Sequence, residues 1–174
     1  MPYGVVRTDN LYGTDVRAGL VSVKYIVTTG SGSSAVDTET AIENGNVLKL
    51  DGLMTGEREI YKGRVPAANT PLEEIVLVAT PELMYDERKH NLDEFINEAG
   101  RIARGYKLHT GDVFSVTKAA LDGKATPAVG DIVELKAGTK LNVAASLTSG
   151  STKVGTVIAV DVVGRYTYYA IRVV

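Results

Sequence analysis

The densest group of side chains that could do chemistry lies in the segment from residue 82 to residue 94. It contains five carboxylates and one histidine: Glu82, Asp86, Glu87, Asp93, Glu94 and His90. Such groups can bind a metal ion or transfer protons, but their spacing matches neither the His-Glu-x-x-His zinc helix nor the aspartate-rich calcium loop. Arg88 and Lys89 lie directly beside two of the acids. We therefore predict a solvated or subunit-facing surface with ion pairs, and no metal site.

Two other patterns invite a catalytic interpretation. Ser115, His109 and Asp112 could be drawn as a nucleophilic triad, but Ser115 is not preceded by the Gly-x-Ser-x-Gly turn that exposes such a nucleophile. The glycine-rich stretch 29–34 lacks the Gly-Lys-Ser/Thr ending of a phosphate-binding loop. We therefore expect a protein that is not an enzyme and that uses no cofactor.

Tyrosine and arginine are the residues most suited to contact a partner. Tyrosine supplies 9 of the aromatic side chains against 2 phenylalanines and no tryptophan, and tyrosine and arginine are enriched at interface hot spots. The candidate partner-binding residues lie near the two ends of the chain: Tyr3, Arg7, Tyr12, Arg17, Tyr166 and Tyr168. The alternative is that they are ordinary loop residues and half-buried strand residues.

Composition limits the class of protein. The chain has 174 residues, 44% hydrophobic, enough for one domain with a core. Its formal charge of -2 gives no global electrostatic basis for nucleic-acid binding. Without cysteine there are no disulfides, thiolate zinc sites or cysteine nucleophiles. No apolar run is long enough to span a membrane and the start does not read as a signal peptide, so we expect a soluble protein with no membrane partner.

One helix is predicted, from Asn91 to about Ala99. Asn91 is a suitable N-cap and Glu94 can complete a capping box. The apolar residues that follow recur at helical spacing: Leu92, Phe95, Ile96 and Ala99. An extension to Arg104 is the alternative, but it would place Gly100 inside the helix at a cost of roughly 1 kcal/mol.

The rest of the chain is predicted to be β-rich. Residues 1–20 have no helical period and are interrupted by glycines, so we expect an extended N-terminal arm that is either mobile or held by a neighbour. Residues 21–174 then form a single β-rich domain. Its expected strands have β-branched or alternating residues between glycine and proline turns: 20–28, 41–43, 46–50, 58–65, 73–80, 113–117, 132–135, 141–145, 154–163 and 166–174.

Turn residues make the strand prediction more specific. Asn44-Gly45, between two apolar runs, predicts a hairpin with a type I′ turn. Gly111-Asp112 and Gly130-Asp131 each lead into a strand, and we expect each aspartate to hydrogen-bond the backbone of its own turn. In the last strand Tyr166 and Tyr168 fall on one face, which we expect to be exposed or shared with a partner. The fold class is thus mainly β: a small antiparallel barrel or sandwich with one short helix and an N-terminal arm.

Several stretches between residues 40 and 174 together resemble the small structural proteins of tailed bacteriophages of Gram-positive hosts, many of them capsid decoration or cement proteins. The stretches that carry the resemblance are Ala41-Ile42-Glu43-Asn44-Gly45, Glu57-Arg58-Glu59-Ile60-Tyr61, 78–87, Asn97-Glu98-Ala99-Gly100, Arg104-Gly105-Tyr106, 111–117 and 166–173. None is a signature motif, so the resemblance transfers no functional residue.

The resemblance implies a non-enzymatic virion protein. It would be made in the host cytoplasm, bind the outside of the head, and bridge and stabilise subunits of the major capsid protein. Many decoration proteins are trimers, so the resemblance also implies self-association on the capsid. Two alternatives stay open: a tail, connector or baseplate component that stacks into rings or tubes, and a carbohydrate-binding β-domain that uses Tyr166 and Tyr168 as sugar platforms.

Overall fold

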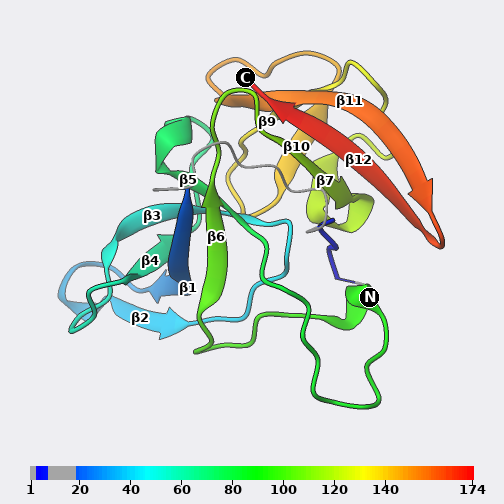
Figure 1. The fold of residues 1–174 in the computed structure, drawn as a ribbon. Helices are drawn as coiled ribbons and strands as arrows, with labels where there is room; N and C mark the ends of the chain where they lie inside the picture. The colour runs from blue at the N-terminus through cyan, green and yellow to red at the C-terminus, as the bar shows by residue number, and fades with distance from the viewer. Residues whose placement is uncertain (1–2, 8–18) are drawn as a thin grey trace.

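The computed structural model describes residues 3–7 and 19–174, and it is a mainly β protein built from two sheets that lie against each other (Figure 1). One sheet closes into a five-strand barrel and the other forms a half-barrel. The predicted fold class is therefore confirmed. Most strand pairs are antiparallel, but β1 pairs with β4 and β8 with β10 in parallel.

The barrel comes from the first part of the chain. The sheet that contains it has six strands: β1 (Leu20–Thr29), β2 (Val36–Glu39), β3 (Val47–Leu53), β4 (Ile60–Arg64), β5 (Ile75–Val78) and β6 (Ala103–Lys107). They lie in the order β2-β1-β4-β3-β5-β6, and an additional pairing between β1 and β6 closes the ring. β2 stays outside the ring and pairs only with the far end of β1.

The half-barrel comes from the second part of the chain. Its strands are β7 (Val113–Thr117), β8 (Leu121–Gly123), β9 (Ile132–Glu134), β10 (Leu141–Ala144), β11 (Lys153–Val163) and β12 (Tyr166–Val173), in the order β7-β12-β11-β9-β10-β8. The described helices are four short 3-10 turns: η2 (Gly32–Ser34), η3 (Leu72–Glu74), η4 (Leu92–Glu94) and η5 (Lys118–Ala120).

Strand β5 is the wall between two hydrophobic cores. Ile75 and Leu77 pack into the core shared with the half-barrel, which includes Phe114. Val76 and Val78 point the other way, into the interior of the barrel. Because successive side chains of a strand face opposite sides, burial of both faces explains why β5 is apolar at every position.

The two glycine-aspartate turns have the predicted structure. The Asp112 carboxylate accepts a hydrogen bond from the backbone N–H of His109 at 2.9 Å, and Asp131 accepts one from Ala128 at 2.7 Å. The side chain of Lys124 and the Ala128 N–H together hold the pKa of Asp131 below its ordinary value. Both aspartates therefore stabilise the entry into their strands, β7 and β9.

The predicted helix is wrong in extent. It begins as expected, with Glu94 bonded to the Asn91 N–H at 3.1 Å, but it ends after the single turn η4. Phe95 is already extended. Asn97 instead forms an antiparallel bridge with Ile42. These non-local hydrogen bonds outweigh the local preference for a helix.

The predicted Asn44-Gly45 hairpin is also wrong. Residues 41–43 do not pair with β3, which pairs with β4 and β5. A type I′ turn needs positive φ at both central residues; Gly45 has φ of 83°, but no described residue other than glycine has positive φ. Asn44 and Gly45 do form a turn, but it closes no hairpin, and the Asn44 amide is buried in tertiary hydrogen bonds.

Part of the predicted N-terminal arm 1–20 is an integral strand. Residues 3–7 are extended, but Val6 forms an antiparallel bridge with Val116 of β7 and is only 2% exposed. They are therefore held by the chain itself, and Leu20 already belongs to β1. Residues 8–18 lie outside the described part of the chain.

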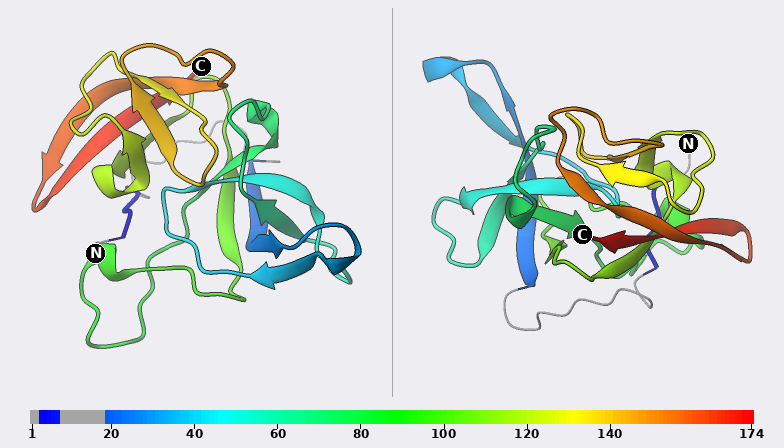
Figure 2. Two further views of the ribbon diagram at one scale, coloured as in Figure 1. Left: turned by 180° about the vertical axis from the view of Figure 1, so that it is seen from behind. Right: turned by 90° about the horizontal axis from the view of Figure 1, so that it is seen from above.

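Two hairpins project from opposite sides of the molecule (Figure 2). One is formed by the end of β1 with β2, and the other by the long strands β11 and β12. In the second hairpin Gly164 has φ of 59° and Arg165 does not have positive φ, as expected for a two-residue turn with glycine in the first position. Its outer part carries exposed Val160, Val162 and Val163.

Replacing Gly45 with alanine is expected to destabilise the fold more than the same change at Gly56. Both glycines have φ of 83°, but a Cβ at Gly45 would lie 2.6 Å from the Ala120 Cβ, whereas Gly56 has open space. Since both glycines have the same φ, the difference between the two losses in free energy of unfolding isolates the steric clash, and we expect about 2 kcal/mol. The losses are measured as shifts of the urea unfolding midpoint with unchanged slope. Equal losses for the two variants would show that the close approach is unimportant.

Candidate partner-binding surface

Four of the six candidate partner-binding residues lie in one region of the structure. Tyr166 and Tyr168 are on β12, and Tyr3 and Arg7 are on the N-terminal strand. Tyr12 and Arg17 fall outside the described residues. Strand pairing brings the two chain ends together, because the N-terminal strand bridges to β7 and β7 pairs with β12.

Two adjacent tyrosines lie between two arginines in what we call the cation–aromatic ladder: Arg165, Tyr166, Tyr168 and Arg7. The Arg165 guanidinium carbon lies 4.9 Å from the Tyr166 ring centroid, and Arg7 lies 5.6 Å from that of Tyr168. The two rings are 6.0 Å apart and tilted by 57°. Such contacts are attractive because a ring face carries negative charge and a ring edge positive charge.

Asp93 fixes one end of the ladder. The Tyr166 hydroxyl donates a hydrogen bond to Asp93 Oδ1 at 2.9 Å, and Arg165 also contacts that carboxylate. Tyr3 donates its backbone N–H to the Asp93 carbonyl at 3.0 Å. These bonds connect the loop that precedes β6 to both chain ends.

Burial changes the interpretation of the ladder. Tyr168 is 3% exposed, so the expectation that it lies on an exposed face is wrong. Its ring is covered because the N-terminal strand brings Arg7 over it. Tyr166 is half-buried, and a shallow cavity of about 410 Å³ lies beside it, also lined by Tyr3 and Lys118. The ladder thus holds three segments of the chain together, and Tyr168 itself offers little surface to a partner.

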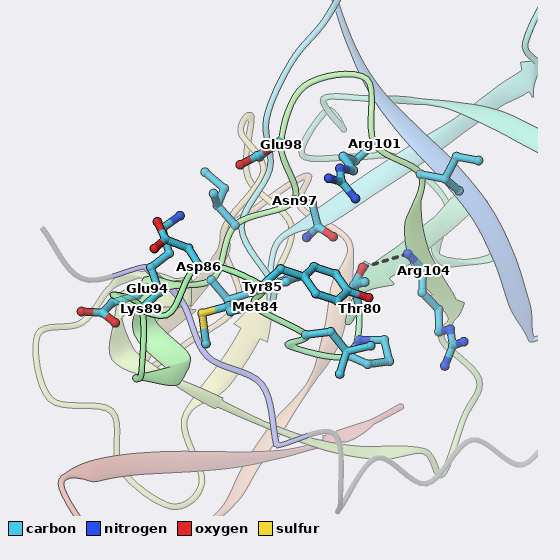
Figure 3. Close-up of a pocket in the computed structure, with 15 residues that line it drawn as sticks. Thr80, Met84, Tyr85, Asp86, Lys89, Glu94, Asn97, Glu98, Arg101 and Arg104 are labelled. Atoms are coloured by element: carbon cyan, nitrogen blue, oxygen red, sulfur yellow. Dashed lines mark hydrogen bonds between the residues drawn. The ribbon is translucent and has the colours of Figure 1, made fainter.

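A second surface lies along residues 80–104, and Figure 3 shows its lining side chains. We call it the loop groove; its volume is about 440 Å³. Asp86, Lys89 and Glu94 lie toward one end, and Arg101 and Arg104 toward the other. The ring of Tyr85 lies between them.

A network of buried amides fixes the floor of the loop groove. Asn97 Nδ2 donates to Asn44 Oδ1 at 3.1 Å and to the Ile42 carbonyl at 3.0 Å. Asn44 in turn exchanges two hydrogen bonds with the backbone of Thr80 and donates to Glu82 at 3.1 Å. Three segments far apart in the sequence are therefore tied together beneath the groove. Buried polar groups that are fully paired specify one arrangement of the chain.

The rim of the loop groove is apolar and exposed. Leu83 is 69% exposed, Tyr85 87% and Ile102 50%. Exposed apolar residues rimmed by polar ones are typical of a protein interaction site. The predicted surface ion pair is present nearby, with Arg88 and Asp86 3.0 Å apart.

The residues of the possible nucleophilic triad lie in structural positions. His109 lies 3.7 Å from Asp112, whose carboxylate already caps its own turn, and Ser115 is a buried residue of β7. In residues 3–7 and 19–174, no three acidic or histidine side chains are grouped in a way that could hold a metal ion. Nor does any helix of these residues have the length and apolar character needed to cross a membrane.

Comparison of the chain with protein families, with curated proteins and with solved structures finds no match.

The sequence does not reveal the loop groove, because the predicted helix over residues 91–99 covers part of the groove lining. The available signal was the run Pro81-Glu82-Leu83-Met84-Tyr85, in which large apolar residues precede a charged segment without strand or helix periodicity.

The carboxylate of Glu94 gives the loop groove a measurable pH dependence. Backbone N–H groups of Asn91 and His90 hold its pKa below the ordinary value of 4.5. The stabilisation of the turn η4 by the ionised Glu94 carboxylate is therefore complete above pH 4.5. It is lost as the pH falls through the lower pKa that Glu94 has in the folded protein.

Backbone amide shifts of His90 and Asn91, followed by NMR during acidification, should show a midpoint below 4.5. Glu94→Gln should remove this transition, because the amide side chain does not titrate. Glu87→Gln, the control at an exposed carboxylate close by, should leave it in place. A midpoint at or above 4.5 would contradict the assignment.

Proposed function

We propose that this protein is a structural component of a bacteriophage virion that binds the outer surface of the head and bridges subunits of the major capsid protein. The observation that carries the proposal is the loop groove, with its exposed apolar rim on a fixed floor. The sequence resemblance to phage structural proteins supplies the kind of partner. The protein would then be located on the capsid surface and act without turnover.

The chemistry of the loop groove favours a protein partner. Its lining contains three cationic side chains, Lys89, Arg101 and Arg104, and three acidic ones, Asp86, Glu94 and Glu98. A balanced lining does not select a polyanion such as DNA, which needs a basic surface. Apolar side chains with mixed charges around them instead match the usual composition of a protein interface.

The scaffold fits a role in adhesion. A closed barrel and a half-barrel that share a core give a rigid body, and the amide network fixes the groove on that body. A rigid site loses little conformational entropy on binding. On a repeating capsid lattice, self-association of neighbouring copies would add avidity, so each copy needs only a modest interface.

The geometry gives less support to the carbohydrate alternative. A sugar platform needs an open aromatic face, but Tyr168 is buried and Arg165 lies over the ring of Tyr166. The tail or connector alternative predicts that the purified protein assembles into rings or tubes, and electron microscopy of the protein alone distinguishes it from the head-binding role.

Co-sedimentation with DNA-free heads of the phage that encodes this chain tests the proposed function. We expect the purified protein to sediment with the heads at a fixed ratio and to raise the temperature at which they disrupt. Binding that does not saturate, or no binding, would contradict the proposal. Addition to preformed heads also separates this role from that of an internal scaffold.

Substitutions on the rim test whether the loop groove makes the contact. Leu83→Ser and Tyr85→Ala should each weaken head binding by roughly tenfold or more, as expected for hot-spot residues. Val129→Ser is the matched control, because Val129 is 64% exposed against 69% for Leu83 but lies in a different loop. If the three variants bind alike, a different surface contacts the capsid.

A further inference from the structure

The N-terminal strand occupies a slot along the outer edge of β7. Arg7 donates its backbone N–H to the Ser115 carbonyl and Thr117 donates to the Val5 carbonyl, both at 3.0 Å. Val5 also donates to the Thr117 hydroxyl at 3.2 Å. This is the hydrogen-bond pattern of an extended peptide added to a sheet edge.

The slot also recognises the side chains of residues 3–7. Val5 and Val6 are 1% and 2% exposed, so both faces of the strand are buried. At Gly4 a Cβ would lie 2.7 Å from the Asn44 carbonyl oxygen and 2.9 Å from the Ala120 Cβ, so the slot accepts only glycine at this position.

Polar contacts fix both ends of the strand. At the start, the Gly4 N–H is 3.1 Å from a Glu43 carboxylate oxygen, and the Tyr3 N–H bonds to the Asp93 carbonyl. At the end, Arg7 lies over the ring of Tyr168. The slot therefore has the features of a specific peptide-binding site for the sequence Tyr-Gly-Val-Val-Arg.

All of the residues that form the slot lie far from the strand in sequence. They belong to the segment before β3, to the loop around η4, to the β7–η5 region and to β12, and Val5 and Thr117, which share a hydrogen bond, are 112 positions apart. The strand joins the rest of the chain only through residues 8–18, which lead to β1 of the barrel. Eleven residues can extend to roughly 36 Å.

We propose that the edge of β7 is a peptide-binding site filled by the N-terminal strand of a second copy of this chain. A strand supplied by another copy makes the same contacts as one supplied by the same copy, so exchange loses no hydrogen bond or buried surface. Reciprocal exchange between two copies closes into a symmetric dimer, and each copy contributes Arg7 to the ladder of the other.

Concentration decides between the two forms. A short covalent connection within one chain provides an effective concentration on the order of millimolar, so a strand from another copy competes with the chain's own strand only near that concentration. Copies held side by side on a repeating surface are in this range. Exchange on a capsid surface rests on the proposed function. Exchange between copies of the purified protein does not, and the experiments below test it there.

The pair Val6 and Val116 gives a direct test by disulfide formation. They form a non-hydrogen-bonded antiparallel pair, since the backbone bonds join their neighbours. Such pairs bring Cα atoms to about 4.5 Å, within the range that a disulfide spans. The chain has no cysteine of its own to interfere, and valine to cysteine is a small change in volume.

The full-length single variants Val6→Cys and Val116→Cys would be unfolded together, refolded at about millimolar concentration and oxidised. We expect a disulfide-linked heterodimer, in roughly tenfold excess over that from Val6→Cys mixed with Val129→Cys, which carries an exposed thiol elsewhere. A yield no higher than in this control would overturn the proposal and leave the strand in its own copy.

A measurement on the unaltered protein covers the case in which a cysteine variant does not fold. Isotope-labelled and unlabelled protein would be refolded together at the same concentration, and NMR would select contacts between differently labelled copies. Cross-peaks between the methyl groups of Val6 and Val116 in different copies support exchange. Their absence, with the same cross-peaks present within one copy, overturns it.

Discussion

The close contact of Gly4, Gly45 and Ala120 is the constraint on which the arrangement of the two sheets depends. A Cβ at either glycine would lie less than 3 Å from the Ala120 Cβ, so three backbones meet where larger side chains could not fit. At this point the N-terminal strand, the segment before β3 and the turn η5 come together. Their approach lets the barrel and the half-barrel share one core, which continuous packing stabilises.

The same contact also determines which part of the chain is left to form a binding surface. Because β5 buries both faces, the barrel needs no helix to cover it on the side of the half-barrel. The long connection between β5 and β6 is therefore free to run over the surface, where Asn44 and Asn97 hold its base. A loop with fixed ends and exposed apolar side chains can present a contact surface without weakening the core.

Two kinds of surface follow from this organisation. The cation–aromatic ladder is mainly internal and joins the two ends of the chain, with Tyr168 buried beneath Arg7. The loop groove is external, and its rim residues Leu83 and Tyr85 have no apolar cover in the described part of the chain. The ladder therefore explains how the N-terminal strand is held, and the groove explains where a large partner could bind.

The sequence by itself determined the mainly β class, five of the six strands of the half-barrel (all but β8) and the two aspartate turns, because alternation and glycine-aspartate chemistry are local signals. It also predicted Tyr3, Arg7, Tyr166 and Tyr168 as partner-binding residues, but it could not show that Tyr168 is buried. Tertiary structure decided the rest. Asn44 and residues 95–99 have local preferences for a turn and a helix, but their hydrogen bonds are made with segments about 35 to 55 residues away. Which edge the N-terminal strand covers, and where the loop groove forms, depend on such distant pairings, and no local pattern encodes them.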